Sequence, residues 1–296
     1  MKPEPHVSSA PVVATEPPLG STPALVSVAP WRTLKRFTDA RIALGRAGHS
    51  LPTSAHLEFQ LAHAQARDAV HLAFDAGGMA SNLESNGLTT LQLHSAAPDR
   101  NTYLQRPDLG RRLSAPSLKV LSQWVARHPP PAPFDVALVV ADGLSALAVH
   151  QNAVPLIAAL HSRLRADPQH AWNLAPVVTV GQARVAVGDE VGQTLGAQAV
   201  VVLIGERPGL SSPDSMGIYL SASPRVGLTD AQRNCISNVR PAGLSVDQAA
   251  DKLHYLLRRA RILGLTGIGL KDDSVQGDSG ALEASRPTLA ANLWRG

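Results

Sequence analysis

The chain has 296 residues, of which 44% are hydrophobic and 17% are charged, a composition typical of a soluble globular protein. Its net charge of +4 is small and its basic residues are scattered, which argues against a nucleic-acid-binding protein. The single cysteine, Cys235, excludes an intrachain disulfide, and no apolar run reaches the roughly 18 residues of a membrane span.

The N-terminal third is predicted to contain a tail and a helical region. Residues 1–31 are expected to be disordered, because seven prolines among small residues leave too little apolar surface to bury. Residues 32–130 are expected to form a smaller, mainly helical region. Its expected elements are a helix over 52–74 capped by Thr53 or Ser54, turns at 77–78 and 82–87, a strand over 88–94 and a helix over 114–127.

The proline-rich segment 129–133 predicts a boundary, after which strands and helices alternate. Such alternation predicts an α/β fold with a doubly wound, mostly parallel, Rossmann-like sheet over residues 131–271. Residues 272–296 lose this periodicity and are expected to be a mobile tail. The expected elements are strands over 136–140, 177–180 and 200–204, and helices along 146–166 with a kink or restart at Pro155, over 188–195, and from the capping box Ser245–Gln248 onward.

The strand that ends at Ile204 points to a functional site. Its apolar, largely β-branched residues predict a strand buried on both faces, and the loop 205–209 that follows carries Glu206 and Arg207 between glycine and proline. Ligands of open α/β sheets bind at the carboxyl ends of such strands. We therefore expect these two charged side chains to contact a ligand or a partner.

Five motifs in order resemble the small (light) subunit of ethanolamine ammonia-lyase, an adenosylcobalamin enzyme. They are Arg41-Ile-Ala-Leu-Gly-Arg-Ala-Gly48, Asn101-Thr-Tyr-Leu-Gln-Arg-Pro-Asp-Leu-Gly-Arg-Arg-Leu113, Val139-Val-Ala-Asp-Gly-Leu-Ser145, Gly205-Glu-Arg-Pro-Gly-Leu210 and Asn234-Cys-Ile-Ser-Asn238. Each motif alone would be only a hypothesis, but five in order over about residues 41–270 make coincidence improbable.

The resemblance implies a subunit of a carbon–nitrogen lyase that converts ethanolamine to acetaldehyde and ammonia by radical chemistry. It implies a large catalytic partner subunit in a six-plus-six assembly, in the bacterial cytoplasm or in a bacterial microcompartment. The cofactor is expected to be base-on, with no protein ligand to cobalt from this chain. The catalytic residues are expected on the large subunit, and this chain is not expected to be active alone.

Three positions are carried over by the resemblance as cofactor-binding residues: Val185, Glu206 and Cys235. Without the resemblance, Glu206 fits an ion pair at an interface and Cys235 fits an inert packing residue. The charged segment around Arg111 is interpreted as a contact with the large subunit or as an anchor for the corrin side chains. The alternative is a solvated helix start with Asp108 as its capping carboxylate.

Several motifs are set aside. Residues 277–280, Gly-Asp-Ser-Gly, match a serine-protease tetrapeptide but lack the His and Asp motifs of that class. No phosphate-binding glycine motif follows a strand. His56, His63 and His71 recur at intervals of about 10 Å along a helix, too far apart to share one metal ion.

Two alternatives from other classes stay open. One is a stand-alone α/β enzyme for a small ligand such as a nucleotide or sugar, with Asp142 and Glu206 acting at adjacent strand ends. The other is a non-catalytic scaffold subunit that binds only a partner protein. Cobalamin binding would separate both from the interpretation above.

Overall fold

The computed structural model describes residues 25–274, so residues 1–24 and 275–296 of the two predicted tails, and the tetrapeptide at 277–280, lie outside the described residues. The chain divides into two compact units, Met1–Gln60 and Leu61–Gly296. The helices and strands are η1 (Arg32–Phe37), α1 (Thr53–His71), α2 (Ala76–Ser85), β1 (Thr90–His94), α3 (Arg100–Gln105), η2 (Leu109–Arg111), α4 (Ala115–Arg127), β2 (Val136–Ala141), α5 (Ala146–Ala166), β3 (Val177–Gly181), α6 (Val187–Leu195), β4 (Ala199–Gly205), β5 (Met216–Ala222), η3 (Asp230–Gln232), β6 (Asn234–Val239), α7 (Val246–Leu263) and η4 (Gly267–Gly269).

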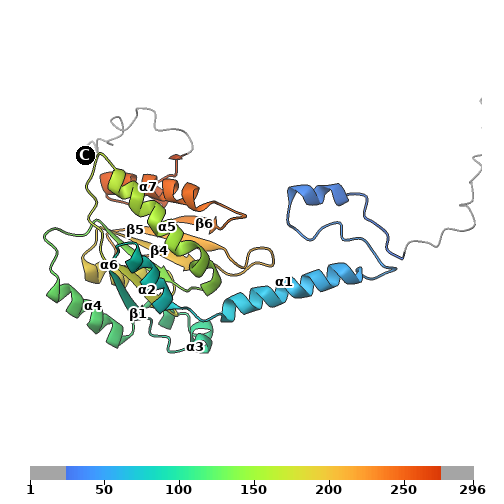
Figure 1. The fold of residues 1–296 in the computed structure, drawn as a ribbon, viewed down its shortest axis with the longest axis horizontal. Coiled ribbons are helices and arrows are strands. Elements are labelled where there is room, and N and C mark those ends of the chain that lie inside the picture. The colour runs from blue at the N-terminus through green and yellow to red at the C-terminus, as the bar shows by residue number, and fades with distance from the viewer. Residues whose placement is uncertain (1–24, 275–296) are drawn as a thin grey trace, which may run out of the picture. The chain divides into compact units, whose positions relative to one another are not determined.

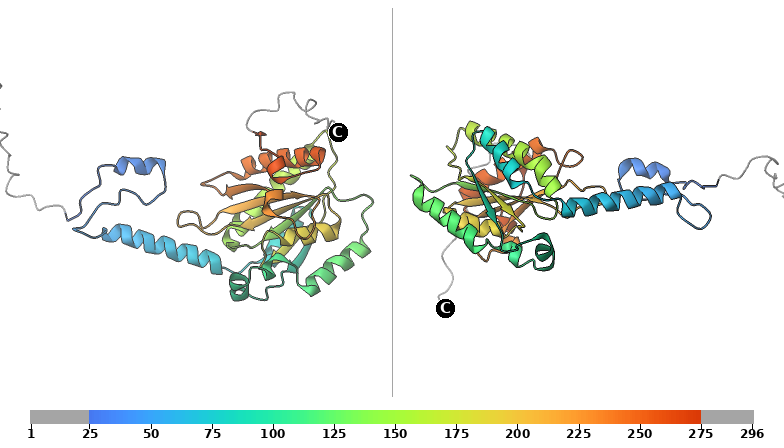
Figure 2. Two further views of the ribbon diagram at one scale, coloured as in Figure 1. Left: turned by 180° about the vertical axis from the view of Figure 1, so that it is seen from behind. Right: turned by 60° about the horizontal axis from the view of Figure 1, so that its bottom comes forward.

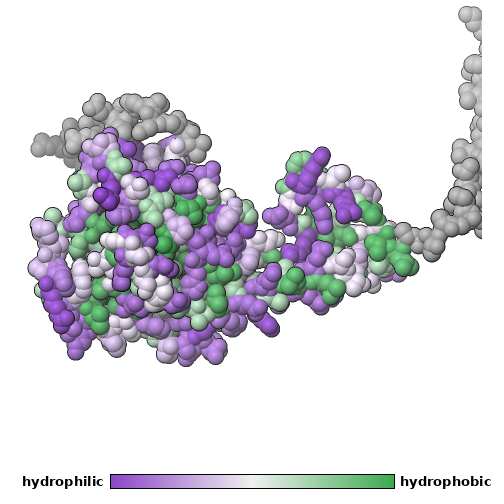
Figure 3. Space-filling view, viewed as in Figure 1, coloured by the Kyte–Doolittle hydropathy of each residue, from purple (hydrophilic) through white to green (hydrophobic). Residues whose placement is uncertain are grey.

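The described part of the first unit exposes much of its apolar surface. Ser27, placed by the sequence in the disordered tail, forms an antiparallel bridge with Arg46 through two backbone hydrogen bonds of 2.8 and 2.9 Å. The short helix η1 buries none of its residues. Trp31 and Phe37 are 60% and 75% exposed, and Figure 3 shows apolar side chains on the surface of this unit.

The second unit contains a six-stranded sheet in the order β1-β3-β2-β4-β5-β6. Strands β1, β3, β2 and β4 are parallel, and β5 and β6 extend the sheet in antiparallel fashion. All of β2 and β4 is buried, as expected for central strands covered on both faces. The predicted α/β class with a mostly parallel sheet is confirmed.

Helices cover both faces of this sheet, as Figures 1 and 2 show from opposite sides. One face packs against α2, α5 and α7 around a cluster that includes Leu138, Val201 and Leu256. The other face packs against α4 and α6 around a second cluster that includes Val139, Val202 and Val191. The alternation of the strand side chains divides the core between the two faces, so the fold is doubly wound.

Local sequence accounts for several elements. Ser114 caps α4, and Ser245 with Gln248 forms the predicted capping box of α7. The helix α5 continues through Pro155 without a restart, because its apolar face is packed against α7 and β4. Packing of a long buried face offsets the loss of one backbone hydrogen bond at proline.

Other elements differ from the expectations. Thr53 and Ser54 lie inside the first turn of α1 instead of capping it. Gly77 and Gly78 lie in α2 instead of a turn, because Asp75 caps this helix by accepting the Gly78 N–H at 2.8 Å. The sequence also did not predict α3, β5 or β6.

The proline-rich segment 129–133 leads from α4 into β2, and β1, which precedes it, pairs with β3 in the same sheet. This segment therefore carries the chain between two strands of one sheet. No helix within residues 25–274 is both long enough and apolar enough to cross a lipid bilayer.

Candidate functional site

Glu206 directly follows the buried strand β4, and its side chain turns back over β5. Its Oε2 accepts a short hydrogen bond from the Ser215 hydroxyl and one of 3.3 Å from the Asn238 N–H. Its Oε1 accepts no hydrogen bond from a described residue. A Cβ on Gly217 would lie only 3.0 Å from Oε1, so the absence of a side chain at this position makes room for the carboxylate. Glu206 is therefore held in place and keeps one free acceptor.

The backbone at Glu206 is fixed by the turn after β2. The Leu144 N–H donates to the carbonyl oxygen of Gly205 at 3.0 Å. Gly143 has a φ of +57°, and a Cβ there would lie 2.2 Å from the same carbonyl oxygen. Only glycine fits this close approach, which explains why two of the motifs named above carry a glycine here.

Cys235 lies on β6 directly opposite Tyr219 of β5. Burial raises the pKa of the Cys235 thiol, the hydrogen bond with Tyr219 lowers it, and the charge of Glu206 raises it again. Burial, with the neighbouring Cys235, raises the pKa of Tyr219 to about 12. Both groups are therefore neutral at physiological pH, and Cys235 presents a thiol, not a thiolate.

Alkylation of Cys235 in the isolated chain is therefore expected to be slow at neutral pH. Its rate should rise only well above the pKa of about 8.5 of an ordinary thiol. Tyr219→Phe removes the hydrogen bond that favours the thiolate, so the pH at which the alkylation rate reaches half its maximum should be higher in the variant. Mass spectrometry of iodoacetamide incorporation across alkaline pH measures both midpoints. A wild-type midpoint at or below 8.5, or a downward move in the variant, would contradict this assignment.

Val185 lies in the turn between β3 and α6. Its side chain packs against the second core cluster, and no described residue accepts a hydrogen bond from its N–H or from that of Ala186. It lines a cavity of about 800 Å³ together with Arg111, Arg112 and Arg184.

The structure brings two of the three predicted site residues into one cluster. Glu206 and Cys235 both raise the pKa of Tyr219, whose side chain packs on the face of the sheet covered by α6. Val185 packs against the same apolar cluster from the end of β3. Tyr219 and Gly217 were missed by the sequence analysis, although the alternation of residues 216–222 is the pattern of a strand.

The crevice where ligands bind in most doubly wound sheets is occupied by the chain's own side chains. The neighbouring strands β2 and β3 are followed by helices on opposite faces of the sheet, α5 after β2 and α6 after β3. The carboxyl ends of these two strands therefore form a topological switch point. Asp142, only 2% exposed, accepts the Ala183 N–H at 2.9 Å there. Arg100 donates to the carbonyl oxygen of Gly143 at 2.8 Å and to Gln182 at 3.3 Å, and it pairs with Asp142 at 3.4 Å.

This arrangement weighs against the stand-alone enzyme that would use Asp142 with Glu206. Burial raises the pKa of Asp142, while the Ala183 N–H and Arg100 lower it. The protonation of this carboxylate therefore depends on contacts inside the protein. Glu206 bonds to a separate set of partners on β5 and β6. The two carboxylates therefore face different surroundings and do not form an acid–base pair.

Arg111 lies in η2 and reaches the cavity beside Val185. Asp108 does not cap this helix with its side chain. It instead forms a two-fold hydrogen bond with Arg106, of 2.7 and 3.0 Å, which lowers its pKa. The predicted helix cap at Asp108 is therefore wrong.

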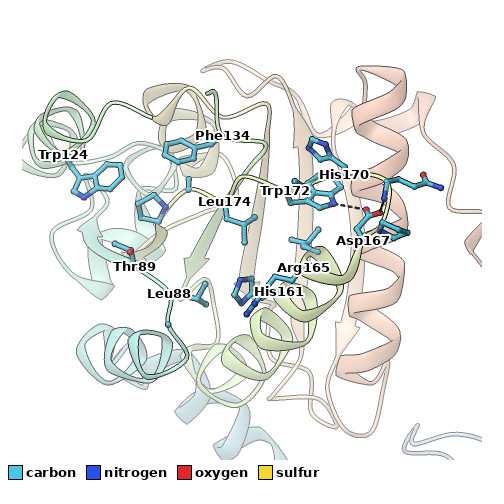
Figure 4. A pocket seen from close by; sticks show the side chains of 17 residues that line it. Leu88, Thr89, Trp124, Phe134, His161, Arg165, Asp167, His170, Trp172 and Leu174 are labelled. Atoms are coloured by element: carbon cyan, nitrogen blue, oxygen red, sulfur yellow. Dashed lines mark hydrogen bonds between the residues drawn. The ribbon is translucent and has the colours of Figure 1, made fainter. Parts of the chain in front are cut away.

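A second cavity, of about 770 Å³, lies at the opposite end of the parallel strands, where β1, β2 and β3 begin (Figure 4). The Trp172 indole N–H donates to Asp167 at 2.9 Å, and His254 lies 3.2 Å from the same carboxylate. None of the three predicted cofactor-binding residues lines it. The other labelled side chains around it are Leu88, Thr89, Trp124, Phe134, His161, Arg165, His170 and Leu174.

The histidines on α1 do not assemble a metal site. His56 lies 3.0 Å from Gln60, its neighbour one turn along the helix, and His71 is exposed. Within residues 25–274, no group of three His, Cys, Asp or Glu side chains is placed to hold a metal ion.

Comparison with known proteins identifies the family. The model of the ethanolamine ammonia-lyase light chain (EutC) matches residues 28–271. The ethanolamine ammonia-lyase small subunit of Ralstonia nicotianae is 60% identical over 251 residues, 85% of this chain and 91% of that protein. The small subunits of Azotobacter vinelandii and Pseudomonas fluorescens SBW25 are 60% and 57% identical, over 83% and 88% of this chain and 89% and 91% of theirs. The chain belongs to the family of ethanolamine ammonia-lyase small subunits.

Proposed function

We propose that this chain is the small subunit of an adenosylcobalamin-dependent ethanolamine ammonia-lyase and closes one side of the cofactor against a large subunit. The observation that carries the proposal is the family membership over residues 28–271, together with the held carboxylate of Glu206. When bound, adenosylcobalamin supplies a radical by homolysis of its cobalt–carbon bond, for the conversion of ethanolamine to acetaldehyde and ammonia.

The residues fit a base-on corrinoid that needs no axial ligand from the protein. Glu206 would offer its free Oε1 to an amide N–H of the ring side chains, and the missing side chain at Gly217 leaves room for that carboxylate. Val185 offers an apolar side chain and an unpaired backbone N–H. Cys235 contributes a neutral thiol, which packs against an apolar surface without a charge to desolvate.

The partner is the large catalytic subunit, in a six-plus-six assembly located in the bacterial cytoplasm, either free or inside a microcompartment. Residues 131–271 form the cofactor-contacting part of this chain. The exposed apolar side chains of the first unit, such as Trp31 and Phe37, support a protein partner, because a monomer seldom exposes several large apolar groups close together. The substrate-binding and radical-stabilising residues belong to the large subunit.

Reconstitution tests the proposal. The purified chain is expected to produce no acetaldehyde from ethanolamine alone, and activity is expected only with the cognate large subunit and adenosylcobalamin together. A second readout is independent of turnover: cofactor in the complex should protect Cys235 from alkylation, more than the large subunit alone does. Turnover by the isolated chain would refute the subunit role. An assembled pair that binds no cobalamin would favour the scaffold alternative.

A further inference from the structure

The cavity beside Val185 gathers arginine side chains from separate segments of the chain. Arg111 and Arg112 come from the segment around η2, and Arg184 comes from the turn between β3 and α6. The cavity measures about 800 Å³ and is open to the surface next to one of the proposed cofactor contacts. The sequence gives no sign that the segment around Arg111 and the turn at Arg184 meet, because residues 111 and 184 are far apart along the chain.

The two segments are locked together, so the arginines are held in a fixed relation. The Arg184 N–H donates to the carbonyl oxygen of Gly110 at 2.8 Å. A Cβ on Gly110 would lie 3.1 Å from the carbonyl oxygen of Gln182 and 3.2 Å from Cγ of Arg184, so the segments touch without an intervening side chain. The Arg184 guanidinium stacks on the Tyr103 ring at 4.5 Å and donates to the Tyr103 carbonyl oxygen at 3.2 Å.

Most acidic groups around the cavity are already engaged. Asp189 forms hydrogen bonds of 2.6 and 2.7 Å with Arg233. Asp108 is bound by Arg106, which does not line the cavity. Glu190 accepts the Leu113 N–H at 2.6 Å, and the fully exposed Asp230 lies 3.5 Å from Arg233.

The arginines, in contrast, have donors to spare. Among residues 25–274, the guanidinium groups of Arg111 and Arg112 have no hydrogen-bond or ion-pair partner, although the charge of Arg112 helps to lower the pKa of Asp108. The unpaired N–H groups of Val185 and Ala186 lie at the start of α6, where a helix favours an anion. Guanidinium forks with backbone N–H groups are the donors that bind phosphate oxygens most specifically.

We infer that Arg111, Arg112 and Arg184 bind the phosphodiester of the cofactor's nucleotide loop, an inference that rests on the proposed function. The side chains around the corrin ring end in neutral amides, whereas the nucleotide loop carries an anionic phosphodiester. Glu206 and Cys235 would contact the ring and the arginines would hold the loop. In keeping with this division, neither Glu206 nor Cys235 lines the cavity that holds the three arginines.

The test compares corrinoids that differ in the phosphate. Adenosylcobalamin, adenosylcobinamide phosphate and adenosylcobinamide are used as competitors against cyanocobalamin bound to the reconstituted complex. For the wild type, removal of the phosphate from cobinamide phosphate should weaken binding about 10- to 100-fold, the worth of one or two charged hydrogen bonds. In Arg111→Ala/Arg112→Ala the preference for cobinamide phosphate over cobinamide should shrink severalfold, because only Arg184 and the backbone N–H groups remain to bind the phosphate, and adenosylcobalamin should also bind more weakly than to the wild type.

Controls separate this inference from its alternatives. Arg127→Ala removes one charge from the exposed end of α4, outside the cavity, and should preserve the discrimination between the two cobinamides. Sedimentation should show that the double variant still assembles with the large subunit. Equal affinity of the wild type for both cobinamides would overturn the inference, and so would loss of assembly, which would assign the arginines to carboxylates of the large subunit. A wild-type complex that binds no corrinoid would instead refute the proposed function itself.

Discussion

Replacement of Arg233 by alanine is expected to lower the free energy of unfolding by about 3–5 kcal/mol, because it leaves a buried carboxylate without its partner. Arg233 and Asp189 have side chains that are each 2% exposed, and their bidentate contact joins the residue between η3 and β6 to helix α6. Arg233 also donates to Ser221 and to the carbonyl oxygen of Leu228, both at 3.0 Å. The hydrogen bond to Asp189 raises the pKa of Arg233, which keeps it charged at every physiological pH.

Thermal unfolding of the isolated chain measures this effect, and the melting temperature should fall by roughly 6–20 °C for a domain of this size. Arg163→Ala is the matched control. Arg163 lies 2.6 Å from Asp251, but that carboxylate is 67% exposed, so its loss should cost about 1 kcal/mol or less. Equal melting temperatures for the two variants would show that the buried pair is not a major source of stability. Arg233→Met with Asp189→Leu should recover most of the loss, because no buried charge then lacks a partner.

Gly217→Ala is expected to weaken cobalamin binding by the reconstituted complex about 10- to 100-fold, the equivalent of one charged hydrogen bond. The new Cβ would lie 3.0 Å from Oε1 of Glu206 and 3.3 Å from Cε2 of Tyr219. The carboxylate must therefore shift by a few tenths of an ångström, which distorts its hydrogen bonds with Ser215 and Asn238. Equilibrium dialysis with cyanocobalamin measures the affinity, and Glu206→Gln, which keeps the size of the side chain, should show a loss of similar size.

A second glycine provides the control for this substitution. A Cβ on Gly77, within α2, would meet only an oxygen of Asp75 at 3.7 Å, an ordinary contact. Gly77→Ala should therefore stabilise the helix by about 0.5–1 kcal/mol and leave cobalamin affinity unchanged. Normal cobalamin affinity in Gly217→Ala would show that the position of the Glu206 carboxylate does not govern the cofactor site.

The parts of the fold that sequence analysis predicted are those specified by neighbours in the chain. The strand β4 follows from its unbroken apolar run, and α7 follows from its capping box and its apolar face. The antiparallel strands β5 and β6 were missed because their pairing is set by tertiary contacts with β4. Gly77 and Gly78 were assigned to a turn for a different reason, since the local cap at Asp75 outweighs two weak helix formers.

The candidate site, too, could be predicted only in part from the sequence. Family resemblance supplied the identity of Glu206 and Cys235, but not the geometry that relates them. Glu206 bonds to Ser215, nine residues away, and to Asn238, 32 residues away, and Tyr219 stands between Glu206 and Cys235 only because of the strand register. These contacts depend on the order and register of the strands in the sheet, which local sequence patterns do not specify.

The position of β3 between β1 and β2 also has a consequence for synthesis of the chain. Thr90 of β1 pairs with Val177 of β3, 87 positions later, and β1 has no other partner strand within residues 25–274. At the ribosomal rate of about 5–20 residues per second, β1 stays without its partner for about 4 to 17 s. During that interval its backbone N–H and C=O groups are open to any other extended chain, so the nascent polypeptide is most exposed to mispairing and to chaperone capture at Thr90–His94.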